Sequence, residues 1–144
     1  MAVKSLSTRI AIIGRGAKCS GGSSAVDRSA YISRTTMYSE YDGTYYYPKY
    51  SEDLVHSEVM LPENAPEEYA DPPVLWNSVE MREKNNSKAQ LARSYKISIP
   101  NEWSYELATE VVRDYVKRNF VDEGMCVQFA IHDSENPVMH QRNL

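Results

Sequence analysis

The stretch QLARSYKISIPNEWSYELATEVVRDYVKRNFVDEGMCVQFAIHD, residues 90–133, contains the three clearest secondary-structure patterns in the chain. Polar and apolar residues alternate from Leu91 to Ile99, which predicts a strand that Pro100 ends. The run MCVQFAIHD, residues 125–133, predicts a second and largely buried strand. Between them, residues 105–120 repeat with a helical period, and Ser104 is suited to cap the helix. Its predicted apolar face consists of Leu107, Val111, Val112, Tyr115, Val116 and Phe120.

The rest of the chain adds shorter elements around this strand–helix–strand unit. The patterns predict a strand at 5–13, a helix at 25–33 capped by Ser23 or Ser24, a hairpin turning at Asp42–Gly43, a connector at 62–73 and an amphipathic helix at 74–85. The resulting order is typical of an α+β fold, in which helices pack on a mainly antiparallel sheet. We expect one domain over residues 1–144.

The composition excludes several classes of protein. The chain has 144 residues, of which 42% are hydrophobic, and this is enough for a buried core. It contains no run of ~18 apolar residues and no convincing secretory signal, so we expect a cytoplasmic protein without a membrane span. The two cysteines, Cys19 and Cys126, lie far apart, which disfavours a disulfide framework or a cysteine-bound zinc ion.

Charge is distributed unevenly along the chain. The formal net charge is -4, yet residues 1–34 contain six basic residues and one acidic residue. Such a separation is typical of a phosphate-facing patch on an acidic body, although a soluble domain whose charges cluster by chance fits it as well. If the patch exists, we expect Lys18, Arg28 and Arg34 to belong to it.

Tyrosine and histidine leave further alternatives open. Six of the eleven tyrosines fall within residues 38–50, where they could stack on unpaired bases or simply form a half-exposed hairpin. His132 closes the last predicted strand and His140 follows eight residues later. Two such imidazoles could share a metal ion, but from spacing alone exposed histidines are the better explanation.

Five segments of the chain, taken in order, resemble the MobA/MobL family of plasmid mobilisation relaxases, which belong to the HUH class of single-strand DNA nickases. The segments are GGSSAVDRSAY (21–31), VMLPENAPEEYADPPVLWNSVE (59–80), KAQLARSYKISIP (88–100), FVDEGMCVQFAIHD (120–133) and ENPVMH (135–140). The resemblance extends from Ser5 to His140. It implies an HUH relaxase-like sandwich in which the helix at 25–33 and His132 lie on the same side of the sheet.

The resemblance also implies a reaction and its participants. Tyr31 matches the tyrosine that attacks the scissile phosphate at an origin of transfer and becomes a 5′-phosphotyrosine. His132 and His140 match ligands of a divalent metal ion, magnesium or manganese, with help from an acidic neighbour such as Asp133 or Glu135. The partners implied are single-stranded DNA, held in a basic groove around Tyr31, and accessory mobilisation proteins.

The chain departs from the family pattern at three places. Val138 stands where the family has the first histidine of a His-x-His pair, and Ser94 and Lys96 stand where it usually has two glutamates. The chain also ends soon after His140, so we expect a domain that is truncated at its metal-site strand. These departures predict weak metal binding. They favour one alternative, a non-catalytic DNA-binding remnant. A tyrosine-rich module that binds a protein partner is a further alternative.

Overall fold

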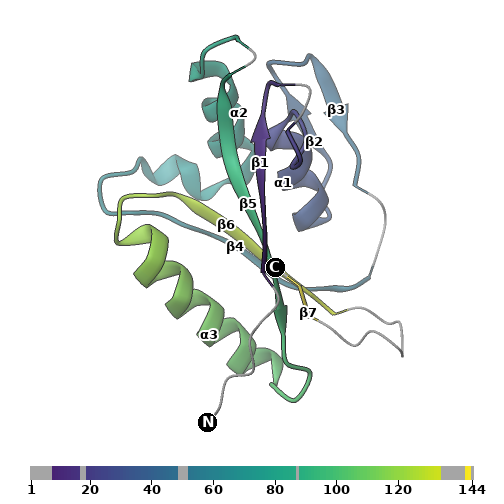
Figure 1. The fold of residues 1–144 in the computed structure, drawn as a ribbon, viewed down its shortest axis with the longest axis vertical. Coiled ribbons are helices and arrows are strands. Elements are labelled where there is room, and N and C mark those ends of the chain that lie inside the picture. Colours follow the sequence, from purple (N-terminus) through teal and green to yellow (C-terminus); the bar gives the residue numbers. More distant parts are fainter. Residues whose placement is uncertain (1–7, 17–18, 49–51, 87, 134–141, 144) are drawn as a thin grey trace.

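The computed structural model describes residues 8–16, 19–48, 52–86, 88–133 and 142–143 (Figure 1). Each of the main patterns in the sequence corresponds to an element of this structure. In chain order these elements are β1 (Thr8–Gly14), α1 (Ala25–Ser33), β2 (Met37–Ser39), β3 (Thr44–Tyr46), β4 (Leu54–Met60), a 3-10 turn (Glu67–Ala70), α2 (Pro72–Arg82), β5 (Gln90–Ile99), α3 (Tyr105–Val116), a π-helical turn (Lys117–Val121), β6 (Val127–Asp133) and β7 (Arg142–Asn143).

Five of the strands form one sheet in the order β1-β5-β7-β6-β4. Every neighbouring pair in it is antiparallel, and the remaining strands, β2 and β3, form a separate hairpin at the predicted Asp42–Gly43 turn. Gly43 has a positive φ of 67°, which an L-residue with a side chain adopts only at a cost. The predicted α+β class with a mainly antiparallel sheet is therefore confirmed.

Helices cover both faces of this sheet. On one face, α3 packs through Ala108, Val112 and Val116 against Phe129 and Ile131 of β6. Successive residues of a strand point to opposite faces, so the residues between these two and on either side of them face the other layer, where α1 and α2 lie. Figure 1 shows α3 well apart from α1 and α2.

The predicted apolar face of α3 is partly wrong. Val112 and Val116 are buried, but Leu107, Val111 and Tyr115 are 41%, 37% and 44% exposed. The helix meets the sheet along the line of residues 108, 112 and 116, in which the small Ala108 allows a close approach, and the neighbouring line of larger side chains is turned toward solvent. The period of 3.6 residues predicted an amphipathic helix. It did not determine which of two adjacent rows of apolar side chains packs on the sheet.

Helix α2 begins at Pro72, inside the segment that was predicted to be a connector. Proline fits the first turn of a helix because its missing N–H has no partner there in any case.

No helix in the described ranges is long and apolar enough to cross a membrane.

The buried carboxyl group of Glu80 joins three elements in the layer of α1 and α2. Only 1% of Glu80 is exposed. Its Oε1 accepts hydrogen bonds from the Ser24 hydroxyl (2.8 Å) and from the Val26 backbone N–H (3.1 Å), and its Oε2 accepts one from the Ser39 hydroxyl (3.1 Å). The Ser24 Oγ in turn accepts from the Asp27 N–H, which makes it the cap of α1. Glu80, on α2, thus holds the start of α1 and the end of β2.

We expect Glu80→Ala to lower the free energy of unfolding by about 3 kcal/mol, because it leaves buried donors on two serines and one backbone amide without an acceptor. Urea unfolding followed by circular dichroism measures the change. Glu83→Ala, at an exposed position just beyond α2, is the matched control and should change stability by less than about 0.5 kcal/mol. Equal stability of the two variants would contradict the role given to Glu80.

Candidate functional site

Tyr31 lies in the last turn of α1 with 44% of its surface exposed. Two guanidinium groups flank its ring: that of Arg28 lies 5.4 Å from the ring centroid and that of Arg34 lies 4.8 Å from it. Arg28 precedes Tyr31 by one helical turn, and Arg34 follows the last residue of the helix. The exposed phenol is therefore bordered by positive charge from its own helix.

Arg34 also fixes the end of α1. It adopts a left-handed backbone conformation (φ 56°), and its N–H closes the helix on the Ala30 carbonyl. Its Nε and Nη2 donate to the two carboxylate oxygens of Asp53 at 3.1 Å each, and its Nη1 donates to the Tyr31 carbonyl at 2.5 Å. Burial opposes the charged form, but the hydrogen bond and the charge of Asp53 outweigh it, so the pKa of Arg34 is raised above its ordinary value. Arg34 is thus a charged clamp on the backbone of Tyr31.

His132 contacts the same helix end from β6. Its imidazole is 8% exposed, and its Nε2 lies 2.7 Å from the Ile32 carbonyl. A carbonyl only accepts hydrogen bonds, so Nε2 carries the proton and donates it. Burial lowers the pKa of His132, with Arg34 and Lys96 lowering it further, although the Ile32 hydrogen bond and Asp53 oppose the shift. The ring is neutral at pH 7 and leaves the lone pair of Nδ1 available to a metal ion, the arrangement common among metal-binding histidines.

The structure brings some of the predicted site residues together and leaves others outside its described ranges. Tyr31 and His132 lie on the same side of the sheet, as expected, because His132 bonds to the carbonyl of the residue after Tyr31. Lys18, Val138 and His140 lie outside the described residues. Within the described part of the chain, no group of three or more histidine, cysteine or acidic residues is placed to hold a metal ion.

Asp133, the expected acidic neighbour, is directed elsewhere. It follows His132 on β6, so its side chain points to the opposite face of the sheet. There the hydroxyl of Tyr105, the first residue of α3, donates to Asp133 Oδ2. Asp133 thus connects α3 to the sheet rather than standing beside His132.

Asp53 is a site residue that the sequence did not indicate. It lies just before β4, its side chain binds Arg34, and its carbonyl accepts from the backbone N–H of Asp133 at 2.8 Å. It therefore joins the end of α1 to the end of β6. No local pattern could reveal it, because its partners are 19 and 80 residues away in the sequence.

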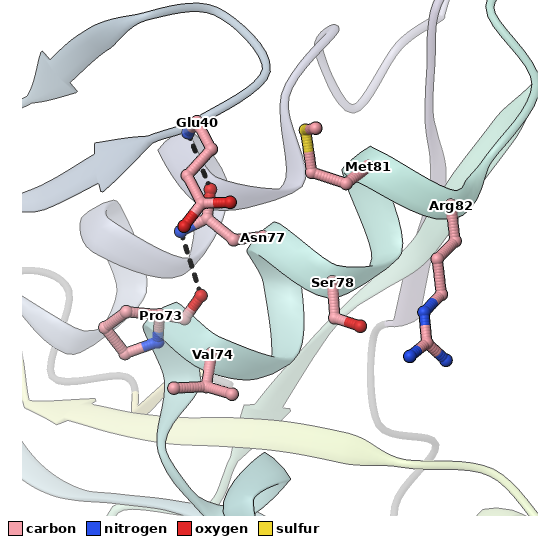
Figure 2. Close-up of a pocket in the computed structure, with 7 residues that line it drawn as sticks. All are labelled: Glu40, Pro73, Val74, Asn77, Ser78, Met81 and Arg82. Atoms are coloured by element: carbon pink, nitrogen blue, oxygen red, sulfur yellow. Dashed lines mark hydrogen bonds between the residues drawn. The ribbon is translucent and has the colours of Figure 1, made fainter.

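The LWNSVE segment of α2 (residues 75–80) connects the elements around the site through side-chain hydrogen bonds. Trp76 Nε1 donates to Gln128 Oε1 on β6 (2.7 Å), and Asn77 accepts the backbone N–H of Glu40 (2.8 Å) and donates to the Pro73 carbonyl (2.9 Å). Figure 2 shows Asn77 between Glu40 and Pro73 in a hollow of about 390 Å³ on α2. Because these polar groups already serve the fold, we treat the hollow as structural.

In a comparison with models of protein families, residues 23–142 match the MobA/MobL family. Among curated proteins, a probable mobilization protein MobA of Bifidobacterium longum is 31% identical over 122 residues, which cover 83% of this chain and 21% of that protein. A probable conjugal transfer protein TraA of Sinorhizobium fredii is 33% identical over 91% of this chain and 12% of its own length. This chain therefore spans about a fifth or less of these relatives.

A solved structure described as the molecular basis of vancomycin resistance transfer in Staphylococcus aureus has the same fold, with a TM-score of 0.80 over 96% of this chain and 66% of the other. The two sequences are 24% identical, so this likeness concerns the fold. The family model covers most of the chain, including α1, α2, β5 and β6. The chain belongs to the MobA/MobL family.

Proposed function

We propose that this chain is a relaxase domain that nicks single-stranded DNA at an origin of transfer, with Tyr31 as the nucleophile. The observation that carries the proposal is the exposed Tyr31 phenol, bordered by Arg28 and Arg34 at a helix end to which His132 is bonded. Membership of the MobA/MobL family and the names of its relatives support a role in mobilisation. The substrate would be plasmid DNA in the cytoplasm, presented together with accessory mobilisation proteins.

The reaction is a transesterification in which one P–O bond replaces another. Tyr31 Oη attacks the phosphorus and loses its proton, the bond from phosphorus to the 3′ oxygen breaks, and that oxygen takes up a proton as it leaves. The products are a 5′-phosphotyrosine and a free 3′-hydroxyl. Negative charge builds on the phosphoryl oxygens during the step, and guanidinium groups beside Tyr31 are suited to balance it.

His132 is suited to be one ligand of a divalent metal ion. His132 is neutral and keeps Nδ1 unprotonated, and His140 is the second ligand that the sequence offers. Magnesium or manganese bound there would stabilise the charge on the phosphoryl oxygens. Two histidines leave most of the coordination sphere to water, so we propose that binding is weak.

The two arginines have different proposed roles. Arg34 is occupied by Asp53 and the Tyr31 carbonyl, so its main task is to fix Tyr31. Arg28 is half-buried, and its guanidinium lies 5.4 Å from the centroid of the Tyr31 ring. A guanidinium group next to the nucleophile is suited to a phosphate. Lys18 and the exposed tyrosines of the β2–β3 hairpin, such as Tyr45 and Tyr47, would extend the contact along the strand.

We expect the protein to form a covalent adduct with single-stranded DNA that depends on Tyr31. Incubation with manganese and a randomised single-stranded oligonucleotide pool, followed by a denaturing gel, should reveal a protein band linked to DNA. Tyr31→Phe should abolish this band, because it removes the attacking oxygen.

Tyr115→Phe is the matched control, since Tyr115 is 44% exposed, as Tyr31 is, and lies on α3. Its adduct should persist. An adduct that survives Tyr31→Phe, or none with the parent protein, would refute the nuclease proposal.

Arg28→Gln should weaken binding of all single-stranded sequences about equally, because a phosphate contact carries no base information. The logarithm of the binding constant should fall less steeply with the logarithm of salt concentration, by about 0.7 for each phosphate that the variant no longer neutralises. Fluorescence anisotropy at several salt concentrations measures this slope. Arg118→Gln, which removes an exposed arginine paired with Asp114, should leave the slope unchanged. Equal slopes for all three proteins would exclude Arg28 from the interface.

Val138→His should raise manganese affinity by about tenfold or more, equivalent to ~1.4 kcal/mol, because it supplies a further imidazole ligand. Calorimetric titration of the parent protein and the variant measures this without any need for activity. Equal affinities would show that position 138 does not face the metal, and the match of the ENPVMH segment to the family pattern would then be wrong.

A further inference from the structure

A lysine and an arginine stand opposite each other on the face of the sheet that carries His132. Lys96 of β5 pairs with Arg9 of β1, and paired residues of neighbouring strands point to the same face. The residue before Lys96, Tyr95, packs its ring on Phe120 at the end of the α3 layer, with the ring centroids 5.1 Å apart. Lys96 therefore points to the opposite face, where α1 and α2 lie. Both basic side chains are exposed.

This pair, which we call the Lys96–Arg9 pair, lies beside the candidate site. Asn143 of β7 pairs with Ser98 on one side and with His132 on the other, so these two residues are level and about 10 Å apart. Lys96 is two residues from Ser98 on the same face, which places its Cα atom about 12 Å from that of His132. The charge of Lys96 acts over this distance, since it contributes to the lowered pKa of His132.

The helices on this face leave the Lys96–Arg9 pair uncovered. Helices α1 and α2 pack against the other end of the two strands, at Ile13 of β1 and at Leu91 and Ala92 of β5. In Figure 1 the lower part of β5 extends beyond both helices. A DNA strand bound at Tyr31 can therefore reach the pair across the face of the sheet.

The Lys96–Arg9 pair does not stabilise the fold. Like charges directly opposite each other on neighbouring strands destabilise a sheet. None of the ion pairs among the described residues includes Lys96 or Arg9, so no carboxylate there offsets the repulsion. An anion between the two groups would offset it. A phosphate is suited to both, because a guanidinium group binds phosphate through two parallel hydrogen bonds and an ammonium group binds it as a point charge.

We propose that Lys96 and Arg9 together bind a backbone phosphate of single-stranded DNA, near the phosphate that Tyr31 attacks. This inference rests on the proposed function, which supplies the DNA strand. Arg34 and Asp53 border Tyr31 on the side of β4, whereas the Lys96–Arg9 pair lies on the side of β5 and β1. The bound strand therefore runs from Tyr31 over the face of β5 toward β1.

The test measures the binding of a labelled oligothymidylate to the Tyr31→Phe chain, which lacks the attacking oxygen. In this background Lys96→Gln and Arg9→Gln should each weaken binding by about threefold or more at low salt, because each removes one of the two charges on the phosphate. In the double variant, the slope of the logarithm of the binding constant against the logarithm of salt concentration should become shallower by about 0.7, the value for one phosphate. Fluorescence anisotropy measures both quantities.

Two further variants control for charge. Arg93→Gln is the matched control, since Arg93 is an exposed arginine of the same strand that points to the other face. It should change neither the affinity nor the slope. Lys96→Arg keeps the positive charge and should bind DNA as the parent does.

Stability separates a DNA contact from a structural role. Lys96→Gln removes a repulsion, so the urea midpoint should stay the same or rise while DNA binding falls. Lys96→Glu can form an ion pair with Arg9 across the strands, so it should raise the midpoint further and weaken DNA binding more than Lys96→Gln does. A midpoint that falls in step with binding would assign the pair to the fold and overturn the proposal.

The remaining outcomes distinguish this inference from the proposed function. Unchanged affinity and slope in the glutamine variants would overturn the inference, even where the Tyr31-dependent adduct forms and the proposed function stands. An equal loss in Arg93→Gln would also overturn it, because only net charge would then matter. Loss of binding in the Lys96 and Arg9 variants alone would support the DNA contact, even where the adduct is absent and the nuclease proposal fails.

Discussion

The placement of α1 depends on the buried carboxyl group of Glu80. Helix α1 has nine residues and is about 13 Å long. A helix this short moves as a unit, so a shift at one end also moves the other end. Glu80 fixes the first end through Ser24 and Val26, and the pair of Arg34 with Asp53 fixes the second. Tyr31 lies between these two anchors, close to the second. Glu80, a residue of α2, thus helps to determine where the Tyr31 phenol lies.

Much of the fold was predictable because its signals are local. The Ser24 cap, the helix at 25–33, the Asp42–Gly43 turn and the alternation in β5 each depend on residues a few positions apart. The order of the strands does not depend on such local signals, since β1 pairs with β5 and β4 pairs with β6 across more than 65 residues. The packing line of α3 was wrong for the same reason. Which apolar line is buried depends on the sheet beneath it, and the sequence of the helix contains no information about that sheet.

The candidate site was also predictable from the sequence only in part. Tyr31, Arg28, Arg34 and His132 could be named from the sequence, because a family resemblance or a basic segment indicated them. The arrangement of these four residues could not be predicted in the same way. The tautomer of His132 follows from a carbonyl 100 residues away, and the clamp on Tyr31 depends on Asp53, a carboxylate that no motif singles out. Asp133 was placed beside the metal by its position in the sequence, and strand alternation turns it to the other face.

Strand β6 carries His132 and also positions α1. Gln128 accepts from the Ser29 hydroxyl at 2.6 Å, and His132 donates to the Ile32 carbonyl. The two residues are four positions apart on one strand, so both belong to the face of β6 that α1 covers. The position of Tyr31 relative to His132 therefore depends on β6 as well as on the contacts of Glu80 and Asp53.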